Sequence, residues 1–247
     1  MAVRVPHARG EEARACLIDL FPEGFEEGSA AGELELAAYT DDAGVERIRR
    51  AFGQGAVTEI AEDWAERWRD FHAPVRVGPL WIGPPWLEPP ADATPVVIDP
   101  GRAFGTGAHP TTRLCIELLL ERGRTSLLDV GCGSGVVSIA AARLGFGPVR
   151  AIDVDPAAVD ATRSNAAVNG VVVDAGLVDA LEADLPEAGL AVANIALEPV
   201  RLVAGRLRSR RLIASGYLAA GDPAPLGWRR LVRRTAAGWA ADLYERE

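Results

Sequence analysis

The chain contains a glycine-rich turn that joins an apolar stretch to a second apolar stretch with helical spacing. Residues 127–130 are mostly apolar and are typical of a buried parallel strand. Gly131, Gly133 and Gly135 follow at alternate positions, which allows a sharp turn and the close approach of a ligand that a Cβ would block. Because the next residues begin a helix, free N–H groups point at that ligand. This arrangement predicts an α/β fold with a ligand site at the end of one strand.

The spacing of these glycines separates two kinds of nucleotide site. The dinucleotide fingerprint is G-x-G-x-x-G, but Val136 stands where its third glycine belongs. The pattern that starts at Asp129, D-x-G-x-G-x-G, instead resembles motif I of the S-adenosylmethionine-dependent methyltransferases. A turn without any ligand is a third interpretation, because a motif match alone is a hypothesis. The spacing therefore favours S-adenosylmethionine as cofactor and disfavours an NAD oxidoreductase.

An acidic residue ends the next predicted strand. Asp153 follows the apolar stretch 149–152 and lies 153 − 131 = 22 positions after the first glycine. A carboxylate here suits a ribose, because it can accept hydrogen bonds from two hydroxyl groups. NAD enzymes share this feature, so it predicts an adenosine ligand without choosing between the cofactors. Asp155, which precedes Pro156, is better placed to cap the next helix.

The composition is that of a soluble globular protein, with 49% hydrophobic and 25% charged residues. The net charge is −9, and such an acidic chain is a poor candidate for sequence-independent binding to nucleic acid. Cys16, Cys115 and Cys132 have neither disulfide-framework nor zinc-motif spacing, and no apolar run approaches the roughly 18 residues of a membrane span. We therefore expect a cytoplasmic monomer without a metal site, membrane contact or direct nucleic-acid partner.

Three regions follow from the distribution of apolar residues, prolines and tryptophans. Residues 1–62 show the order strand, helix, strand, strand, helix, strand, which suggests a small ferredoxin-like α+β domain for docking a substrate. Residues 63–90 begin with an aromatic-rich helical stretch and continue rich in Pro and Gly, so we expect a linker that packs its tryptophans on the catalytic domain. Base stacking on those aromatics is the alternative, but no basic surround supports it. Residues 91–247 form the cofactor-binding domain.

A third informative stretch, residues 96–113, runs from an apolar strand through a loop into a helix. The loop and helix start read D-P-G-x-A-F-G-T-G-x-H-P-T-T-R. Threonine hydroxyls at a helix start can cap it or hold a ligand carboxylate, and His109 by itself is more typical of a loop or capping residue. The whole string resembles the signature of the PrmA-type methyltransferases, which modify ribosomal protein L11 of the large subunit. The linker strings E-D-W-A-E-R-W and P-P-W and the later motifs D-V-D-P and A-N-I are similar to that family in the same order.

This resemblance implies an S-adenosylmethionine-dependent protein N-methyltransferase that acts on lysine ε-amines and the α-amine of that ribosomal protein, docked by the N-terminal domain. Thr112 is expected to hold the methionine end of the cofactor, and Asp153 its ribose. Asn194, at the carboxyl edge of a strand, offers an amide to the acceptor amine or to the cofactor and is the candidate catalytic residue. The candidate cofactor-binding residues are Phe104, Thr112, Asp129, Gly131, Gly133, Gly135, Asp153 and Asn194.

The rest of the chain predicts a doubly wound, Rossmann-like sheet of seven strands. Residues 219–225 are too short and too rich in Pro and Gly for the helix that the family has at this place. We expect the third strand at either 171–173 or 176–179, the fourth at 190–195, a helix at 198–208, the fifth strand at 212–216 and a closing hairpin at 228–235 and 239–244.

Other functions are compatible with parts of this pattern. The same chemistry could act on another protein or on a small amine. A cofactor-binding module without activity is compatible with the short segment 219–225 and with Ala196, where the family usually has Leu. These alternatives differ in the acceptor and in whether transfer occurs, so a labelling experiment separates them.

Overall fold

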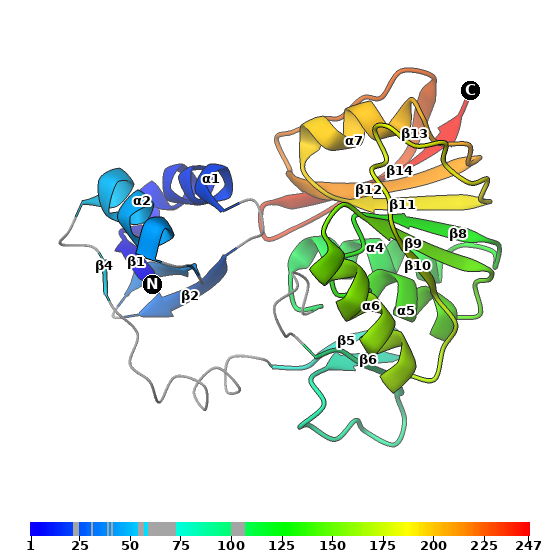
Figure 1. Ribbon diagram of the computed structural model, residues 1–247, viewed down its shortest axis with the longest axis horizontal. Coiled ribbons are helices and arrows are strands. Elements are labelled where there is room, and N and C mark those ends of the chain that lie inside the picture. Colours follow the sequence, from blue (N-terminus) through cyan, green and yellow to red (C-terminus); the bar gives the residue numbers. More distant parts are fainter. Residues whose placement is uncertain are drawn as a thin grey trace. The chain divides into compact units, whose positions relative to one another are not determined.

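The computed structural model describes residues 1–21, 25–30, 32–38, 40, 42–53, 57–58, 73–99 and 107–247. The chain forms two compact units, Met1–Phe71 and His72–Glu247 (Figure 1). The candidate residue Phe104 and the helix expected at the start of the 63–90 region lie outside the described residues. None of the helices within these ranges combines the length and the apolar character that crossing a membrane requires.

The smaller unit is a four-stranded antiparallel sheet with two α-helices. Its strands lie in the order β2-β3-β1-β4, and the neighbouring strands are antiparallel. Val3 and Val5 of β1 flank the exposed Arg4, so one face of this strand joins a core with Leu17 of α1 and Ile48 of α2. The order of elements matches the prediction. The elements are β1 (Ala2–Val5), η1 (His7–Arg9), α1 (Gly10–Leu20), β2 (Glu26–Ala30), β3 (Glu33–Ala37), α2 (Asp42–Phe52) and β4 (Val57–Thr58).

The larger unit is built on a mixed sheet of seven strands in the order β10-β9-β8-β11-β12-β14-β13. The first five strands are parallel, whereas β14 is antiparallel to both β12 and β13. The strand order reverses between β8 and β11, and ligands of such sheets bind beyond the carboxyl ends of the strands at this point. The strands are β8 (Leu127–Val130), β9 (Val149–Asp153), β10 (Asp174–Leu177), β11 (Leu190–Asn194), β12 (Arg211–Leu218), β13 (Trp228–Ala236) and β14 (Trp239–Arg246).

Helices cover both faces of this sheet, with α4, α5 and α6 on one face and α7 on the other (Figure 1). Consecutive residues of β8 face two different cores. Leu127 joins a cluster with Ile116 and Ile139, whereas Leu128 joins a cluster with Val200. Burial on both faces is the reason that this strand is so apolar. The helices are α4 (Pro110–Leu120), α5 (Val136–Arg143), α6 (Pro156–Val168) and α7 (Leu197–Ala204).

A second sheet in the larger unit consists of β5 (Val75–Val77), β6 (Leu80–Gly83) and β7 (Thr94–Val97). Leu80 and Ile82 are buried in the same cluster as residues of α4 and α5, and the Trp81 side chain is also buried. The described part of the segment expected to be a linker therefore contributes two strands to the larger unit.

Several elements differ from their expected bounds, and three of them are instructive. β10 lies between the two stretches considered for the third strand and overlaps 176–179 by two residues, because its position is set by parallel pairing with Arg150–Asp153 of β9. α7 ends at Ala204, where Gly205 is the C-cap, rather than at residue 208. β12 is longer than expected because β14 pairs with it as far as Leu218. The differences in β10 and β12 reflect pairing with a distant strand, which local periodicity does not contain, whereas the end of α7 has a local cause in Gly205.

Candidate functional site

The glycine-rich turn lies at the carboxyl end of β8, where the strand order reverses. Gly131, Gly133 and Gly135 have φ angles of 72°, 53° and 80°, a region that L side chains rarely adopt. A Cβ on Gly131 would also lie 2.3 Å from Cγ2 of Ile195. The prediction that this turn requires glycine is therefore confirmed, and packing as well as backbone conformation requires it.

Asp129 points into the protein from the strand that enters this turn. Its side chain is buried, and the Ser138 hydroxyl on α5 donates a 2.6 Å hydrogen bond to its carboxylate. Burial raises the pKa of Asp129 to about 6; the bond from Ser138 opposes this rise, and the charge of Asp153 adds to it. Because the contact joins β8 to α5 across the turn, Asp129 helps to shape the turn from inside.

Asp153 ends β9 beside the same turn. The amide of Gly133 donates to one carboxylate oxygen at 3.0 Å, and the amide of Asp155 donates to the other at 3.0 Å. The residue is half-buried, and a carboxylate has about four acceptor positions, so capacity is left for hydroxyl groups. Asp155 instead caps α6, because its carboxylate accepts from the amide of Ala157 at 2.8 Å.

The structure brings together two candidate residues from distant parts of the sequence. Asn194 is the last residue of β11, and Thr112 lies in the first turn of α4. Nδ2 of Asn194 donates a 3.3 Å hydrogen bond to Oγ1 of Thr112. Oδ1 of Asn194 is buried and has no hydrogen-bond partner among the residues that the structure describes. Since buried polar atoms normally have partners, this oxygen is available to accept from a ligand.

Two aromatic rings lie at the same edge of the sheet. His109 is the N-cap of α4, and its Nδ1 accepts from the amide of Thr111 at 3.4 Å, which confirms the capping role. Its ring meets that of Trp239 edge to face, with centroids 4.7 Å apart. Trp239 begins β14 and pairs with Leu218 at the carboxyl end of β12. The rings therefore stand on the side where the parallel strands end.

Asn165 of α6 and Asn169, the C-cap of that helix, hold the loops around the turn, and the sequence patterns did not single them out. Nδ2 of Asn165 donates to the Ser134 carbonyl at 2.9 Å, and its Oδ1 accepts from the Asp99 amide at 3.1 Å. Asn169 binds both backbone groups of Val97, at 2.6 and 2.8 Å. Polar residues four apart on the buried side of a helix rich in Ala and Val are the signal that could have found them.

Strand order and site together define the class of protein. The sheet has five parallel strands followed by an antiparallel hairpin. A glycine-rich turn follows the central strand β8, and a carboxylate ends the neighbouring strand β9. This arrangement is that of the class I S-adenosylmethionine-dependent methyltransferases. Within this class, residues 25–221 match the family model for ribosomal protein L11 methyltransferase (PrmA). The chain belongs to this family.

Similar proteins share parts of this chain. A ribosomal protein L11 methyltransferase from Herpetosiphon aurantiacus is 48% identical over 128 residues, which are 49% of this chain and 40% of the relative. One from Dechloromonas aromatica is 43% identical over 151 residues, 59% of this chain and 45% of the relative. The crystal structure of a ribosomal protein L11 methylase from Lactobacillus delbrueckii subsp. bulgaricus matches with a TM-score of 0.63 and 28% identity, covering 72% of this chain and 100% of that chain. The chain spans less than half the length of these curated relatives.

Proposed function

We propose that this protein transfers a methyl group from S-adenosylmethionine to amines of ribosomal protein L11. The observation that supports transfer is the pair of Thr112 and Asn194 at the carboxyl end of β11, which leaves a buried amide oxygen without a partner in the described part of the chain. The acceptor is inferred from the family, since the matched model and the most similar relatives carry that substrate in their names.

The groups at this edge fit the proposed cofactor, which supplies an electrophilic methyl group on a sulfonium. The conformation of Gly131 and Gly133 keeps side chains away from the ligand, and Asp153 has acceptor capacity for its ribose. Thr112, at the N-terminus of α4, is placed to receive a carboxylate. Phe104, which lies outside the described residues, is proposed from the sequence resemblance as a further contact with the cofactor.

The acceptor amine must be uncharged and in line with the methyl group. An exposed lysine has a pKa of about 10.4, and desolvation at the site lowers the pKa of such an amine. Oδ1 of Asn194 can accept one N–H of the amine and so orient its lone pair. Positioning supplies most of the catalysis in this scheme, so a dedicated general base is not required.

The smaller unit is proposed to dock the acceptor protein. Its antiparallel order β2-β3-β1-β4, with helices after the first and third strands, supports assigning it to the ferredoxin-like class. We propose domain limits of 1–62 for this unit, 63–90 for a connecting region whose strands β5 and β6 pack into the larger unit, and 91–247 for the rest of the catalytic part. Among the described residues, Cys16, Cys115 and Cys132 form no disulfide bond, which supports a reducing, cytoplasmic setting, and the monomeric state stays a prediction.

A labelling experiment tests the proposal. The protein is incubated with S-adenosylmethionine labelled in the methyl group and with purified large ribosomal subunits or free L11. Label on L11 is expected. Label on another protein or on a small amine would support the same chemistry with a different acceptor, and calorimetric binding of the cofactor without any label would indicate an inactive binding module.

A further inference from the structure

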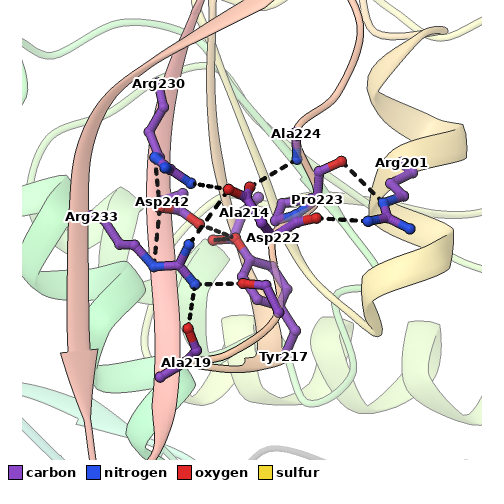
Figure 2. A network of polar contacts seen from close by, with 11 residues as sticks. Arg201, Ala214, Tyr217, Ala219, Asp222, Pro223, Ala224, Arg230, Arg233 and Asp242 are labelled. Carbon is purple, nitrogen blue, oxygen red and sulfur yellow. Dashed lines mark hydrogen bonds and ion pairs between the residues drawn. The ribbon is translucent and has the colours of Figure 1, made fainter.

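The connection between β12 and β13 is held by side chains in place of a helix (Figure 2). We call residues 219–223 the rim segment. Ala219 donates its amide to the carbonyl of Gly238 at 2.7 Å, and Gly221 donates to Leu218 at 2.8 Å. Residues 219–225 contain no helix, as predicted. The carbonyl groups that a helix would satisfy internally therefore need other donors.

Two arginines supply those donors from two separate elements, α7 and β13 (Figure 2). Their guanidinium groups bind four of the five backbone carbonyls of the rim segment, and hydrogen bonds from a charged donor are stronger than neutral ones. The segment is thereby fixed without regular structure of its own. Arg233 donates to Ala219 at 2.9 Å and to Gly221 at 2.5 Å, and Arg201 donates to Asp222 at 2.7 Å and to Pro223 at 3.0 Å.

A buried carboxylate anchors this arrangement from the core side. Asp242 is fully buried, accepts from the Tyr217 hydroxyl at 2.8 Å, and lies 3.7 and 3.8 Å from Nε of Arg230 and Arg233. Arg230 also binds a second carboxylate, that of Asp222 in the rim segment, at 2.8 Å. Burial raises the pKa of Asp242, and both arginines oppose that rise. Carboxylates and guanidinium groups alternate, so each of these charges has an opposite charge within ion-pair distance, while Oδ1 of Asp242 forms no hydrogen bond among the described residues.

The rim segment lies beside the place where Asn194 ends its strand. β12 pairs with β11 up to Asn194 itself. A Cβ on Gly216 would lie 2.1 Å from the carbonyl oxygen of Ile195, and one on Gly221 would lie 3.6 Å from Cδ2 of Leu197. The connection after β12 therefore passes directly against the residues that follow Asn194.

We propose that the rim segment, held by Arg201 and Arg233, forms the acceptor-side wall of the transfer site and selects the polypeptide that is methylated. This inference rests on the proposed function. The acidic group of the segment is paired with Arg230, and its exposed neighbours are small or apolar, as at Leu218 and Ala220. Such a wall suits an acceptor lysine in an extended polypeptide whose flanking residues are apolar, because those residues can pack on the wall. A free small amine has no flanking residues and would gain little from the same surface.

Arg201→Gln tests the inference, because it removes two carbonyl contacts from a half-exposed position. Arg208→Gln is the matched control, since Arg208 is exposed and pairs only with the exposed Asp184 in the described residues. Methyl transfer to purified L11 and calorimetric binding of S-adenosylmethionine are measured for both. Arg201→Gln is expected to raise KM for L11 at least about tenfold, because the rim segment loses two hydrogen bonds from a charged donor and no longer holds the shape that contacts the acceptor. The Kd of Arg201→Gln for S-adenosylmethionine is expected to stay within about twofold of the wild-type value, since a change of that size is smaller than the loss of one hydrogen bond produces.

Arg201→Lys keeps the charge but lacks the planar fork with which Nε and Nη2 of Arg201 reach two separate carbonyls, so it is expected to restore only part of the acceptor KM. An unchanged KM for L11 in Arg201→Gln would overturn the inference, and so would an equal rise in KM for L11 and in the cofactor Kd. A wild-type protein that binds the cofactor but labels no L11 contradicts the proposed function itself, and the rim inference with it. The wild-type measurement therefore distinguishes the two failures.

Discussion

Asn194 donates its side-chain amide to the hydroxyl of Thr112 across 82 residues of sequence, and this bond joins the end of β11 to the first turn of α4. The bond orients the amide so that its oxygen is left for a ligand. The backbone of β11 alone does not set the orientation of the Asn194 amide, because that orientation depends on the Thr112 hydroxyl that α4 supplies.

Thr112→Val is expected to lower kcat about tenfold, because it removes the acceptor that orients the Asn194 amide. Thr112→Ser keeps the hydroxyl and is expected to retain most of the activity. Both variants are compared with wild type by steady-state kinetics of methyl transfer to L11. Equal kinetics of the Val and Ser variants would show that the bond does not position the amide.

Asp153→Ala is expected to weaken binding of S-adenosylmethionine about 10- to 100-fold, the range for lost hydrogen bonds to a charged group, while the fold stays intact. Isothermal calorimetry measures the affinity, and circular dichroism checks the fold. Asp160→Ala is the control, since the Asp160 side chain is 78% exposed and pairs with Arg163. Unchanged affinity of Asp153→Ala would count against the ribose assignment.

Gly131→Ala is expected to destabilise the larger unit for two separable reasons. Its φ of 72° costs about 1–2 kcal/mol with a Cβ, and that Cβ would lie 2.3 Å from Ile195. Gly145→Ala isolates the first cost, because Gly145 has a φ of 88° and a Cβ added there would meet no described atom within 4 Å. In urea denaturation, Gly131→Ala should lose more stability than Gly145→Ala, and adding Ile195→Ala should recover the steric part. Strictly additive effects of Gly131→Ala and Ile195→Ala would contradict this account.

The pH dependence of stability is expected to include a contribution from Asp129. Its pKa is raised in the folded protein to about 6, so the folded state favours the protonated form. The contribution of this group to the free energy of unfolding is therefore highest below the unfolded pKa of about 3.9. It falls as the pH rises through the folded pKa of about 6 and is constant above it. The total loss of stability across this window is roughly 3 kcal/mol. Asp129→Asn removes this slope and can keep the bond from Ser138. Urea denaturation between pH 4 and pH 7 measures both proteins, and parallel curves would refute the assignment.

Asn165→Ala is expected to destabilise the larger unit by about 1–3 kcal/mol, because it removes the hydrogen bonds that the Asn165 side chain makes with two backbone groups. Those groups are the Ser134 carbonyl and the Asp99 amide, on either side of the site. Asn165→Asp keeps an acceptor for the Asp99 amide but sets a buried carboxylate against the Ser134 carbonyl, so at least as large a loss is expected. Thermal unfolding measures the series; equal stability of all three proteins would mean that the asparagine holds neither loop.

Several features of the site could be predicted because their causes are local. Gly131, Gly133 and Gly135 are required by backbone angles within one turn, and the caps at His109 and Asp155 involve residues two positions away. Adjacent parallel strands bring their carboxyl ends to one edge, which also made the edge position of Asp153 and Asn194 predictable. The ligand roles of these residues remain predictions for the experiments above.

Other features follow from partners that lie far away in the chain. β10 takes its register from β9, and β5 and β6 form strands because a core from α4 and α5 covers them. The Pro- and Gly-rich stretch 219–225 could be recognised as lacking a helix, but nothing in it indicates that Arg201 and Arg233 would bind its carbonyls.

The amino-acid sequence alone therefore specifies the turn, the alternation of strands and helices, and the polar residues at strand ends, because these depend on backbone conformation and periodicity over a few residues. The folded chain decides which of those polar groups meet. Asn194 meets Thr112, Asn165 meets Ser134, and Arg201 meets the rim segment only in the folded chain, because each pair comes from elements far apart in the sequence. Burial then gives these contacts their importance, since a polar group removed from water must find a partner wherever the fold places one.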